Sequence, residues 1–314
     1  MRTIQAMNSN QLKKGIAFAI LAAALYAVNA PFSKLLLQKM PPILMAGFLY
    51  AGAGAGMLVI AWIRHLRHTE KQELKLTRAQ LPDTIAMIVL DIAAPICLMF
   101  GLRMTTAANA SLLNNFEIVA TALIALIFFH EKISQRLWLG ILFVTISCGL
   151  LSFEGSESLQ FSLGSLLVLL AATLWGFENN CTRKLSSKDP LQIVLLKGVF
   201  SGGGSILIGL LSGEKIPSLG IVLMVMVVGF IAYGLSIYFY VYAQRLVGAA
   251  RTSAYYAIAP FISTFLSLLI FHEMPDLNYF IALAFMMIGA WLCAQDKPLF
   301  TKKDENTWKV KHAC

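Results

Sequence analysis

Stretches of about 20 apolar residues recur along nearly the whole chain, and this recurrence constrains the fold more than any motif does. A helix of that length crosses a hydrocarbon core of ~30 Å. Of the 314 residues, 58% are hydrophobic and only 13% are charged, whereas a soluble domain carries roughly 25% charge. No aqueous fold buries that much apolar surface, so the sequence predicts an integral membrane protein whose solvent is the lipid bilayer.

Polar breaks divide the apolar stretches into ten predicted transmembrane helices. We place them at 15–37, 42–63, 83–102, 105–129, 137–152, 163–185, 191–211, 219–240, 249–271 and 277–293. The first stretch is longer than the apolar region of a secretory signal, and Pro31 directly follows its small-residue Val28-Asn29-Ala30 site, where it would block cleavage. We therefore expect a retained helix and an all-α membrane protein with ten transmembrane helices.

Basic residues indicate the orientation. Most of the 25 Lys and Arg residues fall on one side of the membrane if the N-terminus is cytoplasmic, and only Lys34, Lys39, Arg103 and Lys215 then fall in outside loops. The positive-inside rule favours this arrangement, with both termini cytoplasmic and the chain in the plasma membrane. Because topology explains the net charge of +9, we expect no nucleic-acid partner. The five cysteines show no metal-ligand spacing, so we expect no disulfide framework.

The two halves of the chain repeat one another in pattern. Residues 25–34 match 174–183 at an offset of 149, and the Phe-His-Glu segment at 129–131 recurs at 271–273. We divide the chain into a cytoplasmic N-terminal segment (1–14), a first five-helix repeat (15–152), a periplasmic linker (153–162), a second five-helix repeat (163–295) and a cytoplasmic tail (296–314). Because five is odd, the second repeat enters the membrane from the opposite side. Inverted repeats of this kind support alternating access in secondary transporters.

Short segments within the repeats resemble a known family. The small-aromatic-polar pattern at 24–29 recurs at 173–178, and the segments 106–111 and 129–132 resemble the fourth helix of EamA-type transporters of the drug/metabolite transporter superfamily. The resemblance covers about residues 15–293, and Lys197 matches the basic residue that the seventh helix of the family often carries. It implies ten helices in two inverted halves and a secondary active transporter that exports a small polar or amphipathic metabolite. Two acids and few buried bases favour a zwitterionic or cationic cargo, such as an amino acid or amine, whereas Lys197 leaves anions open.

Glu117 is the leading candidate for the functional site. It lies about twelve residues into its predicted helix, which places it roughly 18 Å deep and close to the midplane. Acids at this depth are costly and usually face a cavity or a partner. Asn114 lies one helical turn away on the same face, so the two side chains could bind a substrate amine or a proton, whereas Asn115 points elsewhere. The alternative is that Glu117 is protonated or paired and packs within the bundle.

The repeat places Glu178 where Asn29 stands in the first half. The two side chains are therefore predicted at equivalent depths around a shared central cavity. Tyr26 and Trp175, three residues before them, could form aromatic walls for a solute. Packing in the core or against lipid is an equally good interpretation of both aromatic residues.

Asp91 and Lys197 are the remaining charges that we expect to be buried. An ion pair between the third and seventh helices would account for both. If they reach a cavity instead, Lys197 could bind a carboxylate or phosphate and Asp91 could exchange protons, which makes Glu117 and Asp91 the proton-coupling candidates. Tyr233 occupies the repeat position of Asp91 and is a weaker candidate. Pro95 and Pro260 are expected to kink or interrupt their helices.

Other classes of protein are weighed against a transporter. An intramembrane enzyme acting on lipid precursors would need a nucleophile or metal site, and the five histidines lie at helix ends or in loops. The glycines at 52–56 and 202–204 lack the ending of a nucleotide loop, so we assign them to helix packing. A channel or a non-transporting sensor subunit fits an internal two-fold repeat poorly. We expect no catalytic residues, no cofactor and no metal. The expected partners are a small-molecule substrate and the lipid bilayer, with a monomer and a homodimer both left open.

Overall fold

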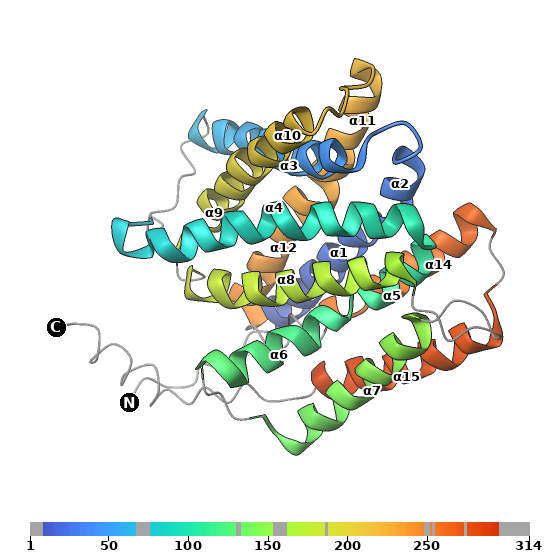
Figure 1. Ribbon diagram of the computed structural model, residues 1–314. Coiled ribbons are helices and arrows are strands. Elements are labelled where there is room, and N and C mark those ends of the chain that lie inside the picture. The colour runs from blue at the N-terminus through green and yellow to red at the C-terminus, as the bar shows by residue number, and fades with distance from the viewer. Residues whose placement is uncertain are drawn as a thin grey trace, which may run out of the picture.

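Every secondary-structure element in the described part of the chain is a helix (Figure 1). The computed structural model describes residues 9–66, 76–129, 133–152, 162–185, 188–247, 252, 255–272 and 275–294. In Figure 1 the helices pack side by side in one bundle, with α4 and α8 adjacent across its middle. The His130-Glu131 pair, Glu273, Cys314 and the tail lie outside the described residues.

The helices follow the apolar stretches of the sequence closely. The first half contains α1 (Ser9–Ala27), α2 (Asn29–Leu36), α3 (Pro42–Leu66), a short 3-10 turn η1 (Arg78–Gln80), α4 (Leu81–Met104), α5 (Ala107–Leu113), α6 (Phe116–Phe129) and α7 (Gln135–Ser152). The second half contains α8 (Leu163–Leu185), α9 (Pro190–Leu196), η2 (Lys197–Ser201), α10 (Gly202–Leu211), α11 (Leu219–Gly229), η3 (Phe230–Leu235), α12 (Ser236–Val247), α14 (Ala259–Phe271) and α15 (Leu277–Ala294).

Within the residues that the structure describes, seven helical stretches are long and apolar enough to cross a membrane. They are Gln11–Leu36, Pro42–Leu66, Arg78–Met104, Ala107–Phe128, Gln135–Ser152, Leu191–Leu211 and Leu219–Ala243, and two shorter apolar helices cover Ala259–Phe271 and Leu277–Cys293. Large side chains such as Trp62, Phe128 and Trp291 are exposed on the bundle. An apolar outer surface of this kind is stable in lipid and not in water, so the chain is an integral membrane protein.

Three predicted helices are divided near their middles. The first is interrupted at Val28, the fourth at residues 114–115 and the ninth at residues 257–258. Pro31 and Pro260 explain two of the breaks, because a proline ring clashes with the carbonyl four residues earlier and cannot donate a backbone hydrogen bond. At the break in the fourth helix, the side chains of Asn114 and Asn115 compete with the helix for backbone hydrogen-bond partners. Pro95, by contrast, does not interrupt its helix, because α4 runs continuously from Leu81 to Met104.

The seventh and eighth predicted helices each contain a π-helical segment that the sequence did not indicate. These segments are η2, which begins at Lys197, and η3, which contains Tyr233. Wider turns of this kind occur inside α-helices mostly at functional sites. Each segment carries one of the candidate residues, Lys197 in η2 and Tyr233 in η3, and both residues are buried in the bundle.

Glycines allow α3 to pack directly against the second half of the chain. A Cβ atom at Gly52 would lie 2.1 Å from the carbonyl oxygen of Met226, and one at Gly54 would lie 3.0 Å from the backbone of Gly198. Small residues at helix crossings allow this close approach in membranes. The assignment of these glycines to packing therefore agrees with their contacts, although a Cβ atom at Gly203 would have no neighbouring atom within 4 Å.

Gly52 and Gly203 provide a matched pair of variants. We expect Gly52→Ala to lower the free energy of unfolding by roughly 1–3 kcal/mol, because the methyl group must displace the backbone of α11. Gly203→Ala enters open space and should change stability by less than about 1 kcal/mol. Thermal unfolding in detergent measures both values. Equal stability of the two variants would contradict the crossing described for α3 and α11.

Candidate functional site

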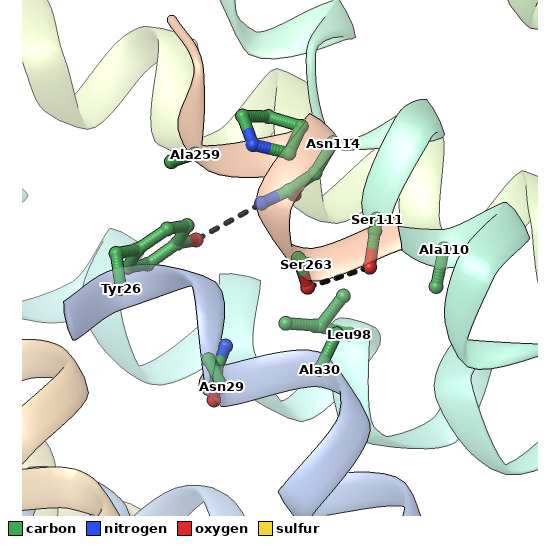
Figure 2. A pocket seen from close by; sticks show the side chains of 10 residues that line it. Tyr26, Asn29, Ala30, Leu98, Ala110, Ser111, Asn114, Ala259 and Ser263 are labelled. Atoms are coloured by element: carbon green, nitrogen blue, oxygen red, sulfur yellow. Dashed lines mark hydrogen bonds between the residues drawn. The ribbon is translucent and has the colours of Figure 1, made fainter. Parts of the chain in front are cut away.

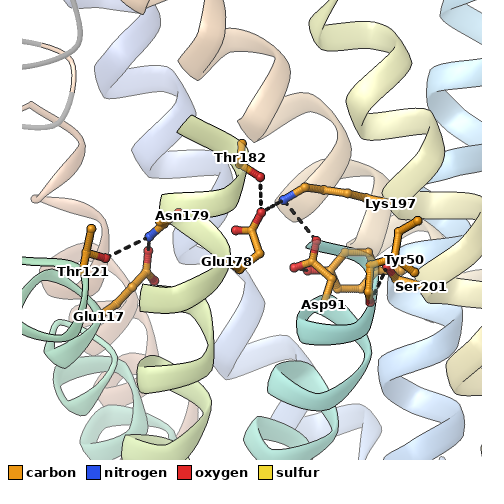
Figure 3. A network of polar contacts seen from close by, with 10 residues as sticks. Tyr50, Asp91, Glu117, Thr121, Glu178, Asn179, Thr182, Lys197 and Ser201 are labelled. Carbon is orange, nitrogen blue, oxygen red and sulfur yellow. Dashed lines mark hydrogen bonds and ion pairs between the residues drawn. The ribbon is translucent and has the colours of Figure 1, made fainter. Parts of the chain in front are cut away.

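Helix α8 presents polar side chains to both of its neighbours at the centre of the bundle. Glu178 and Asn179 are adjacent in sequence, and successive residues of a helix point about 100° apart. Figure 3 shows the consequence: Glu178 is directed toward Lys197 and Asp91, whereas Asn179 is directed toward Glu117. Because α8 packs against both α4 and α6, it lies between two acidic groups of the first half.

Asp91, Glu178 and Lys197 form a central ion cluster. The Lys197 ammonium lies 2.7 Å from Glu178 Oε1 and 3.1 Å from Asp91 Oδ2. Tyr50 donates a hydrogen bond of 2.9 Å to Asp91 Oδ1, and Thr182 donates one to Glu178. Asp91, Glu178 and Lys197 are only 1%, 4% and 6% exposed. Burial without pairing would be very costly for each charge, so the three groups stabilise one another.

Glu117 has a different environment from the other two acids. Its Oε1 accepts a hydrogen bond of 2.6 Å from Asn179 Nδ2, which also lies 3.3 Å from Thr121 Oγ1. Its residue is half-buried. Among the described residues, no basic side chain forms an ion pair with it. Glu117 is therefore the one central acid that is partly accessible and bonded only to neutral groups.

A small pocket lies where the three divided helices meet (Figure 2). Its polar lining consists of Tyr26, Asn29, Ser111, Asn114 and Ser263. Asn114 Nδ2 donates to the Tyr26 hydroxyl at 2.9 Å, and the hydroxyls of Ser111 and Ser263 are 2.8 Å apart. About 20 Å³ is open to the centre of a water-sized sphere. This space suits one or two water molecules and is too small for an amino acid.

Tyrosine rings connect the pocket to the central ion cluster. Tyr50 packs on Tyr233 with ring centroids 5.0 Å apart, and Tyr26 contacts Tyr233 and Tyr256 at 6.0 and 5.9 Å. Asn29 Nδ2 donates a hydrogen bond of 2.9 Å to the Tyr233 hydroxyl. These contacts place an aromatic layer between the neutral pocket and the charged cluster.

The structure places the residues singled out in the sequence in three groups. Tyr26, Asn29 and Asn114 line the pocket. Asp91 and Lys197 form the ion pair that was weighed as the alternative to a cavity role, and Glu178 extends it. Trp175 is 6% exposed in the hydrophobic core and does not line the pocket.

The expected relation between Asn114 and Glu117 is modified by the break in their helix. Asn114 is the C-cap residue of α5, whereas Glu117 lies in the first turn of α6. Asn114 binds Tyr26 and Glu117 binds Asn179, so the two side chains have separate partners. The prediction that they act on one substrate therefore depends on a ligand that reaches both.

Sequence reasoning missed several residues of the site. Asn179 was overlooked although it stands in a run of three polar residues, Glu178 to Asn180, within an apolar helix. That run was a usable signal, because polar residues within a membrane usually have partners there. Tyr50 and Tyr256 carried no such signal, since tyrosine is common in membrane helices. Among the described residues, no group of three or more His, Cys, Asp or Glu side chains could hold a metal ion.

Comparison with known proteins identifies a family. The EamA-like transporter family matches residues 13–153 and, a second time, 162–295. An uncharacterized transporter of Methanothermobacter thermautotrophicus is 24% identical over 290 residues, which are 87% of this chain and 84% of that protein. One of Clostridium kluyveri is 26% identical over 298 residues, which are 89% and 92% of the two chains. A protein crystal structure of 19% identity superposes with a TM-score of 0.61 over 90% of this chain and 95% of its own.

Proposed function

Because the chain belongs to the EamA-like transporter family of the drug/metabolite transporter superfamily, we propose that it is a secondary active transporter. Its cargo is a small polar or amphipathic metabolite, such as an amino acid or amine, which it exports from the cytoplasm by alternating access. The observation that carries the proposal is that the central ion cluster and the pocket both lie inside the bundle. Charged and polar side chains are costly to place in a membrane, and those within it usually mark the path of a solute.

The proposed topology has ten transmembrane helices in two inverted halves, at about 15–152 and 163–295, with both termini in the cytoplasm. The family match to each half supports this division. In this orientation Glu178 and Lys197 lie in the cytoplasmic halves of their helices, whereas Ser111 and Ser263 lie in the outer halves. Cargo would therefore pass from the charged cluster, across the tyrosine layer, to the neutral pocket.

Conformational change is required by the size of the pocket. This pocket has room for water alone, so the divided helices that line it must move apart for cargo to enter it. Alternating access supplies this movement, because the inverted halves can exchange their conformations. Breaks in α1–α2 and α5–α6 provide places where the outer segments can tilt separately from the inner ones.

Proton coupling is assigned to the acids of the site. Glu117 can hold a proton or a cationic cargo group, but not both at once, and mutual exclusion of this kind exchanges cargo for protons. Asp91 is the second candidate, because neutralising it would weaken its pair with Lys197. In this scheme a proton enters the site from outside and is released to the cytoplasm. Cargo from the cytoplasm then takes its place and is exported.

Reconstituted vesicles test the proposed function. Amino acids and amines are first screened for thermal stabilisation of the purified protein, because a ligand of the folded state raises its apparent stability. We expect a stabilising compound to enter vesicles at a rate that saturates with concentration, and to accumulate against its gradient when a pH gradient is imposed. A rate that rises linearly without saturation would instead indicate a channel. Absence of any flux for every stabilising compound would contradict a transporter.

A further inference from the structure

We propose that Lys197 is a built-in counter-ion that limits the cargo of this site to one positive charge. The inference depends on the proposed function, since it concerns the cargo of the same central region. Two of the three central acids are already paired with Lys197, whereas the third, Glu117, has only neutral partners (Figure 3). An ammonium group of the cargo therefore has one carboxylate to pair with.

The pairing at Lys197 leaves little of either carboxylate accessible. The ammonium lies within 3.1 Å of both Asp91 and Glu178, and each of these acids also accepts a hydroxyl hydrogen bond. All three groups are less than 10% exposed. Displacing a tethered ammonium by a free one gains no charge interaction and loses the entropy of the free molecule. Cargo should therefore not compete with Lys197.

The surroundings of Glu117, in contrast, suit a single ammonium group. Its carboxylate accepts a hydrogen bond from the neutral Asn179 side chain. The Oδ1 atom of Asn114 is buried and has no hydrogen-bond partner, although the same side chain donates to Tyr26. An ammonium group carries several N–H donors, so cargo that reaches both side chains can supply the missing hydrogen bond to Asn114 and a counter-charge to Glu117.

The side chains of α8 are consistent with this division. Helix α8 directs Asn179 toward Glu117 and Glu178 toward Lys197 (Figure 3). With Lys197 in place, Asp91 and Glu178 are both paired, so Glu117 is the central carboxylate left for a cargo ammonium.

Removal of Lys197 should therefore admit a second positive charge. The main variant is Lys197→Met combined with Asp91→Asn, because it removes one charge of each sign and keeps the net charge of the cluster at its original value. Glu178 is then a free carboxylate. The probes are linear diamines from ethylenediamine to cadaverine, each compared with the monoamine of the same length. Binding is measured as thermal stabilisation of the purified protein over a range of probe concentrations.

We expect the wild-type protein to bind each diamine no more tightly than its matched monoamine. In the double variant, at least one diamine should bind at least about tenfold more tightly than its monoamine, because a second ion pair forms. Lys197→Arg, which retains the charge, should keep the wild-type preference. Size-exclusion chromatography and helical circular dichroism verify that each variant is folded.

Two results would overturn the role of Lys197. A wild-type protein that already prefers diamines would show that its paired acids are open to cargo. A folded double variant with the wild-type ratio of affinities would show that Lys197 does not set the charge of the cargo. These are binding measurements in detergent, so they test the role of Lys197 even if vesicles show no transport. Absence of transport would reject the proposed function and not the role of Lys197.

Discussion

Glu117→Gln is expected to lower the initial rate of transport about a hundredfold. Glutamine keeps the size of the side chain and can still accept the hydrogen bond from Asn179, but it cannot carry a negative charge or a proton. Loss of one buried charge pairing costs roughly 3 kcal/mol, which corresponds to that factor. Uptake of a labelled stabilising compound into vesicles, measured with and without a pH gradient, provides the test.

Asp83→Asn is the matched control for this variant. Asp83 pairs with Lys184 at 2.8 Å near the ends of α4 and α8, with side chains 27% and 39% exposed. Exposed pairs contribute about 0–1 kcal/mol, so transport should stay within about threefold of wild type. Wild-type rates and wild-type pH dependence in Glu117→Gln would remove this acid from both binding and coupling.

Lys197→Met alone is expected to lower the free energy of unfolding by about 3–5 kcal/mol. The substitution leaves two carboxylates buried without a cation, and breaking a buried ion pair from one side is strongly destabilising. Adding Asp91→Asn should restore much of the loss, because it removes one of the uncompensated charges. Thermal unfolding of the single and double variants in the same detergent measures the difference.

Lys184→Met serves as the control, because its ion pair with Asp83 is exposed. This substitution should lower the free energy of unfolding by less than about 1 kcal/mol. If Lys197→Met were as stable as Lys184→Met, the central ion cluster would not be held together as the structure describes. A double variant less stable than Lys197→Met would likewise contradict the pairing of Lys197 with Asp91.

The helical architecture could be predicted from sequence because lipid imposes one requirement on every segment. Each crossing must satisfy its own backbone hydrogen bonds, so apolar length alone locates the helices. The repeat was visible in short matching segments, and the family match to 13–153 and 162–295 confirms that the chain belongs to the family it resembles. Of the three breaks, the one next to Pro260 was predicted and the other two were not. Pro31 could have indicated one of these two, whereas Pro95 shows that a proline does not always divide a helix.

The site was less predictable because its partners come from helices far apart in the sequence. Position within an apolar stretch was sufficient to select Asp91, Glu117 and Lys197, since charges there are rare. Their pairing depended on how α4, α6 and α8 pack, which hydropathy does not encode. Two neighbours of Glu178 on α8 show the limit. Asn179, the next residue, bonds to Glu117, whereas Trp175, three residues earlier, packs in the hydrophobic core. Only the packed bundle shows which neighbour each side chain contacts.

Counterflow tests most directly whether one central site is exposed alternately to the two sides of the membrane. Vesicles containing the wild-type protein are loaded with a high concentration of an unlabelled stabilising compound, and entry of the same labelled compound from outside is then followed. Alternating access predicts transient accumulation of label above its equilibrium level, with no pH gradient or other driving force. Entry that only approaches equilibrium, at a rate unaffected by the compound inside, would contradict a carrier with a single alternating site.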